Sequence, residues 1–351
     1  MPRNPYYDQQ KAHHTEKGFR NPKGSPRRPP FTAEVAREAA HFMGEMTRTL
    51  KHYPFPDDHV IAQPQALELF NGCTAQQKLL WLGHASFLIE LNGVRVLTDP
   101  YLTDYASPVP TRSTKRLVPS AIAIENLPSV DVIVISHNHY DHLDTKALKA
   151  LAKRFPRAQV VVPLGLKPLI KKQGFDSIVE LDWYDNVNLN TLDITAVPAI
   201  HMSRRGLLDM NQTLWCGFAI AQQNFKIYFA GDTAYGPVFK EVGQKLGPFD
   251  LGLVPIGAYQ PRSLMNVVHT TPEEAIQIGE DIQAANLIGM HWGTIRLTTE
   301  PMMEPKQRFL NAESTIPRST LRIGETVALD AASISEQSAC DIPLATTPPP
   351  V

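Results

Sequence analysis

The sequence contains few cysteines, and they show no regular spacing. Only three occur in 351 residues, at Cys73, Cys216 and Cys340, and no two of them form a Cys-x-x-Cys pair. An odd and widely spaced set argues against a disulfide framework. We therefore expect a reducing compartment or simple buried thiols, with Cys216 as a small core residue.

Long apolar runs and a strong net charge are also missing. No stretch reaches the roughly 20 apolar residues that a membrane-spanning helix needs. The first residues, 1–7, lack the apolar core of a secretory signal, and the formal net charge is only −1 at pH 7. A near-neutral chain has no overall positive field to attract nucleic acid. These absences predict a cytoplasmic protein without a nucleic-acid partner, for which any membrane contact would be peripheral.

A dense group of histidines follows one short apolar run. His137, His139, Asp141 and His142 come directly after the β-branched run 130–135. Such a run is typical of a buried strand, and ligands collect at the C-terminal ends of strands in α/β sheets. Imidazole and carboxylate suit zinc or a similar first-row ion. Four side chains that diverge from one loop fit two adjacent ions better than one; a histidine-rich surface loop is the plainer alternative.

Three further strand patterns each end in a residue that can bind a metal. His201 follows the pattern 192–197, Asp232 follows 225–230, and His291 follows 285–290. The same arrangement recurs on three separate strands, so we expect these side chains to join the group at 137–142.

The order of these residues resembles that of the metallo-β-lactamase fold superfamily. Within it, longer strings resemble the branch of N-acylphosphatidylethanolamine-hydrolysing phospholipases D. The resemblance covers roughly residues 75 to 305, and its strings are 83–85, 97–100, 136–144, 162–165, 180–183, 229–233, 247–251, 255–259, 272–275 and 291–294.

The resemblance implies a site with two zinc ions. His137, His139 and His201 would hold one ion, Asp141, His142 and His291 would hold the other, and Asp232 would bridge the two. Manganese or iron suits similar ligands. Two such ions share a hydroxide that attacks phosphorus, which makes Asp141 and Asp232 catalytic residues as well as ligands.

Three more residues are expected near the ions. His269 matches a family position, where it would steady the phosphoryl group or help the leaving alkoxide gain a proton; a helix-entry histidine without a role is the alternative. Asp99 is expected to accept a hydrogen bond from a ligand imidazole. His84 is expected either in the same supporting shell or in a purely structural role.

The predicted fold is an α/β (α+β) four-layer αββα sandwich with an N-terminal extension. Residues 75–330 would form the hydrolase domain, and residues 331–351 a flexible tail. Residues 1–60 would form an arm and an amphipathic helix from Thr32 to about His52. The apolar stripe of this helix is expected to pack on the core or, alternatively, to face lipid or an acyl groove. It consists of Val35, Ala36, Ala39, Met43, Met46 and Leu50.

The substrate is inferred from the resemblance alone. It implies a zinc-dependent phosphodiesterase that cleaves N-acylphosphatidylethanolamine to N-acylethanolamine and phosphatidic acid. A hydrolase of a lactone or of another phosphodiester is the alternative, because one fold hosts many reactions. We expect the headgroup to meet basic residues and the cleft to have aromatic walls, and homo-oligomers are compatible with the sequence. The candidate substrate-binding residues are Arg112, Lys115, Arg116, Tyr140 and Tyr259.

Overall fold

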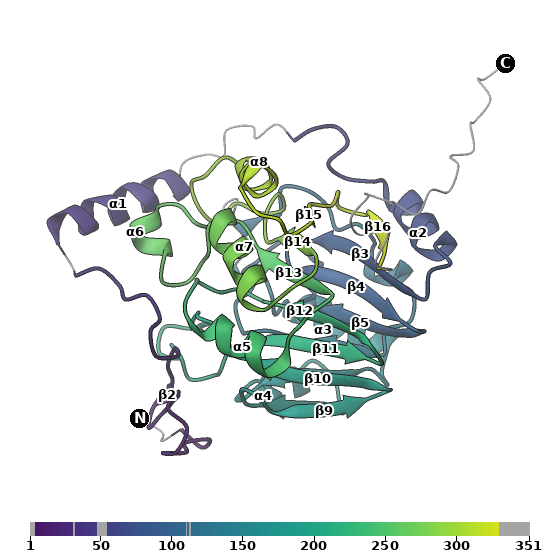
Figure 1. Cartoon of the computed structure of the whole chain (residues 1–351), viewed down its shortest axis with the longest axis horizontal. Helices are drawn as coiled ribbons and strands as arrows, with labels where there is room; N and C mark the ends of the chain where they lie inside the picture. The colour runs from purple at the N-terminus through teal and green to yellow at the C-terminus, as the bar shows by residue number, and fades with distance from the viewer. Residues whose placement is uncertain (1–3, 31, 48–54, 110, 112–113, 330–351) are drawn as a thin grey trace.

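The computed structural model describes residues 4–30, 32–47, 55–109, 111 and 114–329. Two seven-stranded sheets stack face to face with helices on their outer sides (Figure 1), so the predicted αββα sandwich is confirmed. Each sheet is covered on both faces, which explains why its central strands are apolar throughout rather than alternating. One continuous core fills the space between the two sheets.

The first sheet combines antiparallel hairpins with parallel strands. Asn92 and Gly93 form the turn between β4 (Ser86–Leu91) and β5 (Val94–Thr98), and both have positive φ, as a tight hairpin turn requires. From β5 onward the strands run parallel. The strands in spatial order are β16 (Thr326–Ala328), β3 (Gln77–Gly83), β4 (Ser86–Leu91), β5 (Val94–Thr98), β6 (Val132–Val134), β7 (Gln159–Pro163) and β8 (Ile178–Leu181).

The second sheet repeats this scheme. Its antiparallel half runs from β9 to β12, and its parallel half runs from β12 to β15. The strands in spatial order are β15 (Arg318–Ser319), β14 (Leu287–Met290), β13 (Leu251–Pro255), β12 (Phe225–Phe229), β11 (Gly217–Gln222), β10 (Leu192–Val197) and β9 (Asn186–Leu189).

The helices begin where the local sequence supplies a cap. Asp144 Oδ1 accepts hydrogen bonds from the backbone N–H groups of Lys146 and Ala147 at the start of α3. Thr271 and Glu274 form a capping box at the start of α7. Besides the short helix η2 (Ile124–Asn126), the sandwich carries α2 (Gln63–Gly72), α3 (Thr145–Arg154), α4 (Lys167–Lys171), α5 (Val238–Leu246), α6 (Arg262–Met265), α7 (Pro272–Asp281) and α8 (Glu304–Asn311).

The carboxylate of Asp182 is one of the groups that attach the N-terminal arm to the sandwich. The arm contains the short strands β1 (His14–Thr15) and β2 (Gly18–Phe19). Lys11 Nζ, His13 Nε2 and His14 Nε2 lie 2.6, 2.6 and 2.9 Å from the carboxylate oxygens of Asp182. These contacts tie the arm to the end of β8.

Helix α1 (Ala33–Thr47) lies at the periphery beside α6 (Figure 1). Thr32 Oγ1 accepts a hydrogen bond from the N–H of Val35, as a helix cap does. The expectation that the apolar stripe packs on the core is wrong for the described part, because Met43 is 59% exposed and no side chain of residues 33–46 is buried. The last stripe residue, Leu50, lies outside the described residues.

Two other expectations can be compared with the structure. Cys216 is a buried free thiol, but the expectation of unpaired thiols is wrong for Cys73, which is disulfide-bonded. In the described parts of the chain, no helix has both the length and the apolar composition needed to cross a bilayer. The predicted tail, 331–351, lies outside the described residues.

Candidate metal centre

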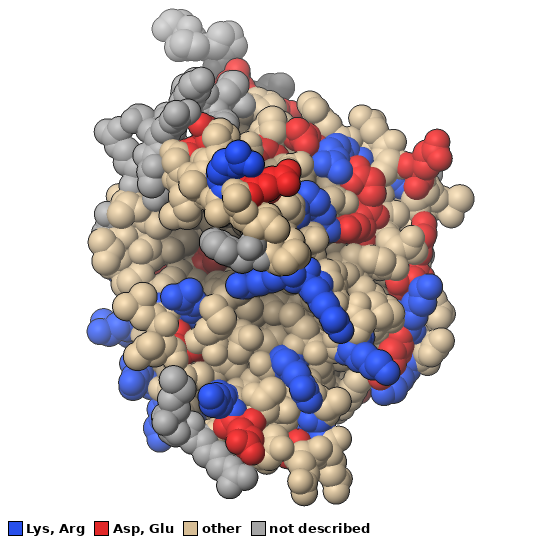
Figure 2. Space-filling view, turned by 90° about the vertical axis from the view of Figure 1, so that its left-hand side faces the viewer, with Lys and Arg blue, Asp and Glu red and all other residues tan. Residues whose placement is uncertain are grey.

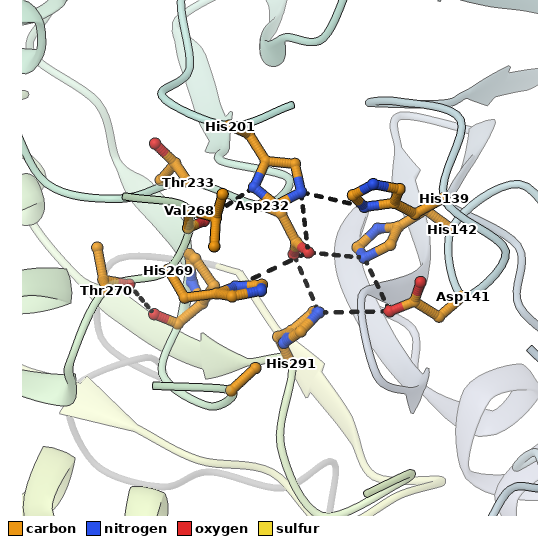
Figure 3. Close-up of polar contacts among 12 residues, drawn as sticks. His139, Asp141, His142, His201, Asp232, Thr233, Val268, His269, Thr270 and His291 are labelled. Atoms are coloured by element: carbon orange, nitrogen blue, oxygen red, sulfur yellow. Dashed lines mark hydrogen bonds and ion pairs between the residues drawn. The ribbon is translucent and has the colours of Figure 1, made fainter. Parts of the chain in front are cut away.

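Four strand ends bring the predicted ligands to one place. The loop that carries His137 to His142 follows β6 of the first sheet, whereas His201, Asp232 and His291 follow β10, β12 and β14 of the second. Figure 3 shows the labelled histidines from both sheets pointing toward Asp232. The site therefore lies where the C-terminal ends of strands from the two sheets meet.

The two halves of the site approach each other closely at Gly231. Its φ is +60°, and a Cβ atom there would lie 2.6 Å from Ser136 Cβ. Only glycine adopts this conformation at low cost and leaves that space open. Gly231 thus allows the Asp232 carboxylate to reach the loop of the opposite sheet.

The first group of donor atoms comes from three histidines and Asp232. His139 Nδ1 lies 2.9 Å from His137 Nε2 and 3.2 Å from His201 Nε2. The Nδ1 of His201 faces the Val268 carbonyl at 2.8 Å, so it carries the proton and leaves the Nε2 lone pair facing inward. Burial lowers the pKa of His139 to about 4 and that of His201 to about 3. These imidazoles are neutral at pH 7, which is the form that binds metals.

The second group consists of His84, Asp141, His142 and His291. Within each of the two groups, the potential ligand atoms lie no more than 4.8 Å apart. Asp141 Oδ2 lies 3.5 Å from His142 Nε2, 3.7 Å from His291 Nε2 and 2.9 Å from His84 Nε2.

Asp232 lies between the two groups. Its Oδ1 is 3.1 Å from His291 Nε2, and its Oδ2 is 3.2 Å from His142 Nε2 and 3.8 Å from His201 Nε2. Burial alone would raise the pKa of Asp232, but the neighbouring His142 and His291 imidazoles hold it well below the usual range. The carboxylate is therefore ionised, with both oxygens close to the second group and Oδ2 also within 4.0 Å of His137 and His201 in the first.

These donors fit a pair of divalent cations. Buried His142 Nε2, His291 Nε2 and Asp232 Oδ1 have no hydrogen-bond partner of good geometry among the described residues. Leaving such atoms buried without partners is costly, and a bound cation would satisfy all three. The mixture of imidazole and carboxylate donors suits zinc and its first-row neighbours.

The buried carboxylate of Asp99 contacts the candidate ligand His142 and the loop that carries it. Asp99 Oδ2 lies 2.7 Å from His142 Nδ1, and Asp99 Oδ1 accepts the N–H of Ser136 at 2.7 Å. The contact with Asp99 fixes the proton of His142 on Nδ1 and leaves Nε2 free for a metal. His137 Nδ1 has a similar contact of 2.9 Å with Ser136 Oγ.

Asn21 supports His201 and was not identified from the sequence. Its Oδ1 accepts hydrogen bonds from the backbone N–H of His201 at 2.9 Å and from Trp215 Nε1 at 3.0 Å. The N-terminal arm thereby holds the loop that carries one candidate ligand. Nothing in the polar and turn-rich sequence around Asn21 distinguishes it from its neighbours.

We expect N21A to weaken metal binding about tenfold, at the lower end of the range for residues that support ligands. Loss of the acceptor frees the backbone of His201 to move. N21D keeps an acceptor oxygen and should bind metal more tightly than N21A. Competition with a chelating dye measures this affinity, and an N21A protein that binds as tightly as the wild type would contradict the role.

His269 lies at the edge of the centre. Its Nδ1 is 3.9 Å from Asp232 Oδ2 and has no hydrogen-bond partner among the described residues. Burial lowers the pKa of His269 to about 3, so the ring is neutral at pH 7. A neutral ring can donate one hydrogen bond but is a weak source of protons.

Two of the candidate substrate-binding residues, Tyr259 and Arg116, are buried in the protein. Tyr259 is fully buried and donates its hydroxyl to Glu304 at 2.7 Å, so the prediction that it forms a cleft wall is wrong. Tyr140 is half-buried and donates to the carbonyl of Arg205. Lys115 is exposed, and Arg112 lies outside the described residues.

Arg116 was expected to bind an anionic headgroup, and this prediction is also wrong. Its guanidinium is buried and donates to the carbonyls of Tyr101, Val118 and Leu82. The Arg116 side chain thus points into the protein, where it satisfies backbone groups that water does not reach.

R116M is therefore expected to lower the free energy of unfolding by about 3 kcal/mol, because it leaves several buried carbonyls without a donor. The Michaelis constant should stay unchanged. K115M is the matched control, and its exposed position predicts a change of at most about 0.5 kcal/mol. Urea denaturation measures the free energy of unfolding of both variants. A stable R116M protein with a raised Michaelis constant would restore a role in substrate binding.

Comparison with known proteins decides the family. A model of the beta-lactamase superfamily domain matches residues 94–292. The chain belongs to the metallo-β-lactamase superfamily. It is 41% identical to N-acyl-phosphatidylethanolamine-hydrolyzing phospholipase D 1 of Caenorhabditis elegans over 269 residues, which cover 74% of this chain and 75% of the worm protein. This relative identifies the phospholipase D-like branch of the superfamily, as the sequence strings predicted.

More distant relatives agree with this assignment. The mitochondrial N-acyl-phosphatidylethanolamine-hydrolyzing phospholipase D of Saccharomyces cerevisiae is 35% identical over 252 residues, but the match covers 70% of this chain and only 53% of the yeast protein. Among solved structures, the isothiocyanate hydrolase from Delia radicum gut bacteria has a TM-score of 0.59 at 21% identity, covering 71% of this chain and 98% of that chain, which supports the fold alone. The protein is thus an enzyme of the metal-dependent hydrolase class.

Proposed function

We propose that this protein is a phosphodiesterase of the phospholipase D type that converts N-acylphosphatidylethanolamine and water to N-acylethanolamine and phosphatidic acid. The observation that carries the proposal is the convergence of seven candidate ligands in a chain that is 41% identical to a worm enzyme named for this reaction. In this reaction the oxygen of water bonds to phosphorus, and the bond between phosphorus and the ethanolamine oxygen breaks. The alcohol then leaves with one of the protons of water.

The proposal assigns the donors to two zinc ions. His137, His139 and His201 would hold one ion, Asp141, His142 and His291 the other, and Asp232 would contact both. When bound, two such cations lower the pKa of water and stabilise negative charge at phosphorus. Asp99 keeps the ring of His142 oriented for this task.

His269 is assigned to hold the substrate rather than to supply the proton. Its ring is buried and neutral, and its free Nδ1 faces the centre near Asp232. In the tautomer protonated at Nδ1, the ring can donate a hydrogen bond to a phosphoryl oxygen as charge grows there.

An apolar cavity beside the centre supports an amphipathic substrate. It has a volume of about 510 Å³, and its lining includes Met202, next to His201, and Val268, next to His269. Helix α1 contributes Val35 and Ala39 to the lining, in which Arg28 is the one charged side chain among the described residues. A cavity of this composition suits hydrocarbon better than a charged polymer.

A panel of substrates tests the proposal. Purified protein should release N-acylethanolamine from N-acylphosphatidylethanolamine and leave a lactone, a β-lactam and a cyclic nucleotide unchanged. In water enriched with oxygen-18, the label should appear in phosphatidic acid, because the attack is at phosphorus. Rapid lactone opening without turnover of the lipid would instead favour the alternative activity. Label in the N-acylethanolamine would exclude attack at phosphorus.

A further inference from the structure

Two leucines are presented to solvent on one turn. Leu207 is 86% exposed and Leu208 is 84% exposed, more than any other large apolar side chain among the described residues. A single exposed leucine is ordinary, but two adjacent ones at the tip of a turn form an apolar surface that favours a partner.

The turn is held in a defined shape. The carboxylate of Asp209 accepts hydrogen bonds from the backbone N–H groups of Arg205 and Gly206, at 2.8 to 3.3 Å. Gln212 Nε2 donates to the carbonyl of Leu208 at 2.8 Å. These bonds fix the backbone of the turn. The exposure of the two leucine side chains therefore follows from a defined backbone conformation.

The turn is also attached to the loop that carries the candidate ligands. Arg205 Nη1 donates to the carbonyls of Asn138 and Leu143, at 2.7 and 2.8 Å. The same guanidinium lies 3.9 Å from the ring centroid of Tyr140, whose hydroxyl donates to the Arg205 carbonyl. A partner surface that binds the two leucines would therefore lie next to the candidate metal centre.

The neighbouring surface is basic. Residues 20–30 contain four cationic and no acidic side chains, namely the exposed residues Arg20, Lys23, Arg27 and Arg28. The arm contacts the residues that flank the turn on either side: Phe19 N, directly before this segment, donates to Asn211 O, and Arg28 contacts Met202 Sδ. Figure 2 shows Lys and Arg side chains around a hollow on the side of the molecule that faces left in Figure 1.

We propose that Leu207 and Leu208 insert into the surface of an anionic phospholipid bilayer while residues 20–28 bind its headgroups. Stable but reversible attachment to a bilayer requires both apolar insertion and cationic contacts with headgroups, because either kind of contact alone gives weak binding. The inference extends the proposed function, because it names the surface from which a lipid would enter the site.

Vesicle binding tests the inference without any turnover. Sucrose-loaded vesicles of phosphatidylcholine alone, or with phosphatidylglycerol, contain no N-acylated lipid, so binding does not depend on the proposed activity. The wild type should sediment with the anionic vesicles. L207S/L208S should lower the partition coefficient about tenfold or more, because two largely exposed leucines lose their burial in lipid. L310S is the matched control, since Leu310 is exposed on α8, and it should bind as the wild type does.

Two further variants test the cationic contacts and the depth of insertion separately. R27Q/R28Q should weaken binding to anionic vesicles, and added salt should reduce this difference. The tryptophan introduced by L208W should be quenched by lipids that carry bromine on their acyl chains, while the four native tryptophans are buried and should not respond. Unquenched fluorescence of the L208W protein on vesicles, or L207S/L208S binding equal to the wild type, would overturn the inference. A change in the association of protein copies with unchanged vesicle binding would overturn it as well.

Discussion

D232N is expected to reduce the rate of lipid hydrolysis at least about a thousandfold, which corresponds to roughly 4 kcal/mol of lost transition-state stabilisation. Asp232 is the carboxylate that lies between the two groups: its oxygens are 3.1 and 3.2 Å from His291 and His142 of the second group, and Oδ2 is 3.8 Å from His201 of the first. The amide removes the negative charge that offsets two cations and leaves a weaker donor. The purified variant should therefore also contain less metal, as elemental analysis would measure.

D131N is the matched control for this substitution. Asp131 precedes β6, the strand whose other end leads to the candidate ligands, and its Oδ2 accepts the N–H of Arg95 at 2.9 Å. Loss of its charge should leave both the rate and the metal content near those of the wild type. A D232N enzyme with an unchanged rate would refute the assignment of Asp232 to both ions.

Removal of metal by a chelator is expected to abolish hydrolysis and to lower the melting temperature. The centre buries two carboxylates and several imidazoles, and cations that bind only the folded state stabilise it. Without cations, buried polar atoms such as His291 Nε2 again lack partners. Addition of zinc should restore both properties, and parallel addition of manganese or iron would identify the ion that supports the highest rate.

D232N serves as the control for the melting experiment. Because this variant should already have lost metal, the chelator should change its melting temperature much less than that of the wild type. Full activity of the wild type in excess chelator, at a metal content below detection, would contradict the proposed metal dependence.

The strands and the metal-binding loop could be predicted because their signals are local. Apolar runs such as 130–135 lie directly before the histidines, and a strand fixes which end of the run carries the loop. The same reasoning predicted His201, Asp232 and His291 at the ends of their strands, and the structure brings them within reach of one another. Local pattern and global fold agree here.

Side-chain direction in loops could not be predicted in this way. Arg116 and Tyr259 are polar residues near the expected cleft, but the packing of the sandwich turns both of them inward. Helix α1 shows the converse, since its apolar periodicity is real but the helix lies at the periphery. Periodicity identifies an apolar face and does not say what covers it.

Contacts between segments that are distant in the sequence could not be predicted either. Asn21 meets His201 across 180 residues of sequence, and its amide oxygen becomes significant only through that contact. The Leu207–Leu208 turn lies beside the candidate ligands because the Arg205 guanidinium donates to the carbonyls of Asn138 and Leu143. A single sequence contains no periodic signal for such pairs.

Anomalous diffraction from crystals of the purified protein, recorded at the absorption edge of the metal found by elemental analysis, tests the central claim most directly. The proposal predicts two sites per chain, one among His137, His139 and His201 and the other among Asp141, His142 and His291, with Asp232 in contact with both. Occupied metal only at the separate cluster of His13, His14 and Asp182, with none around Asp232, would contradict it.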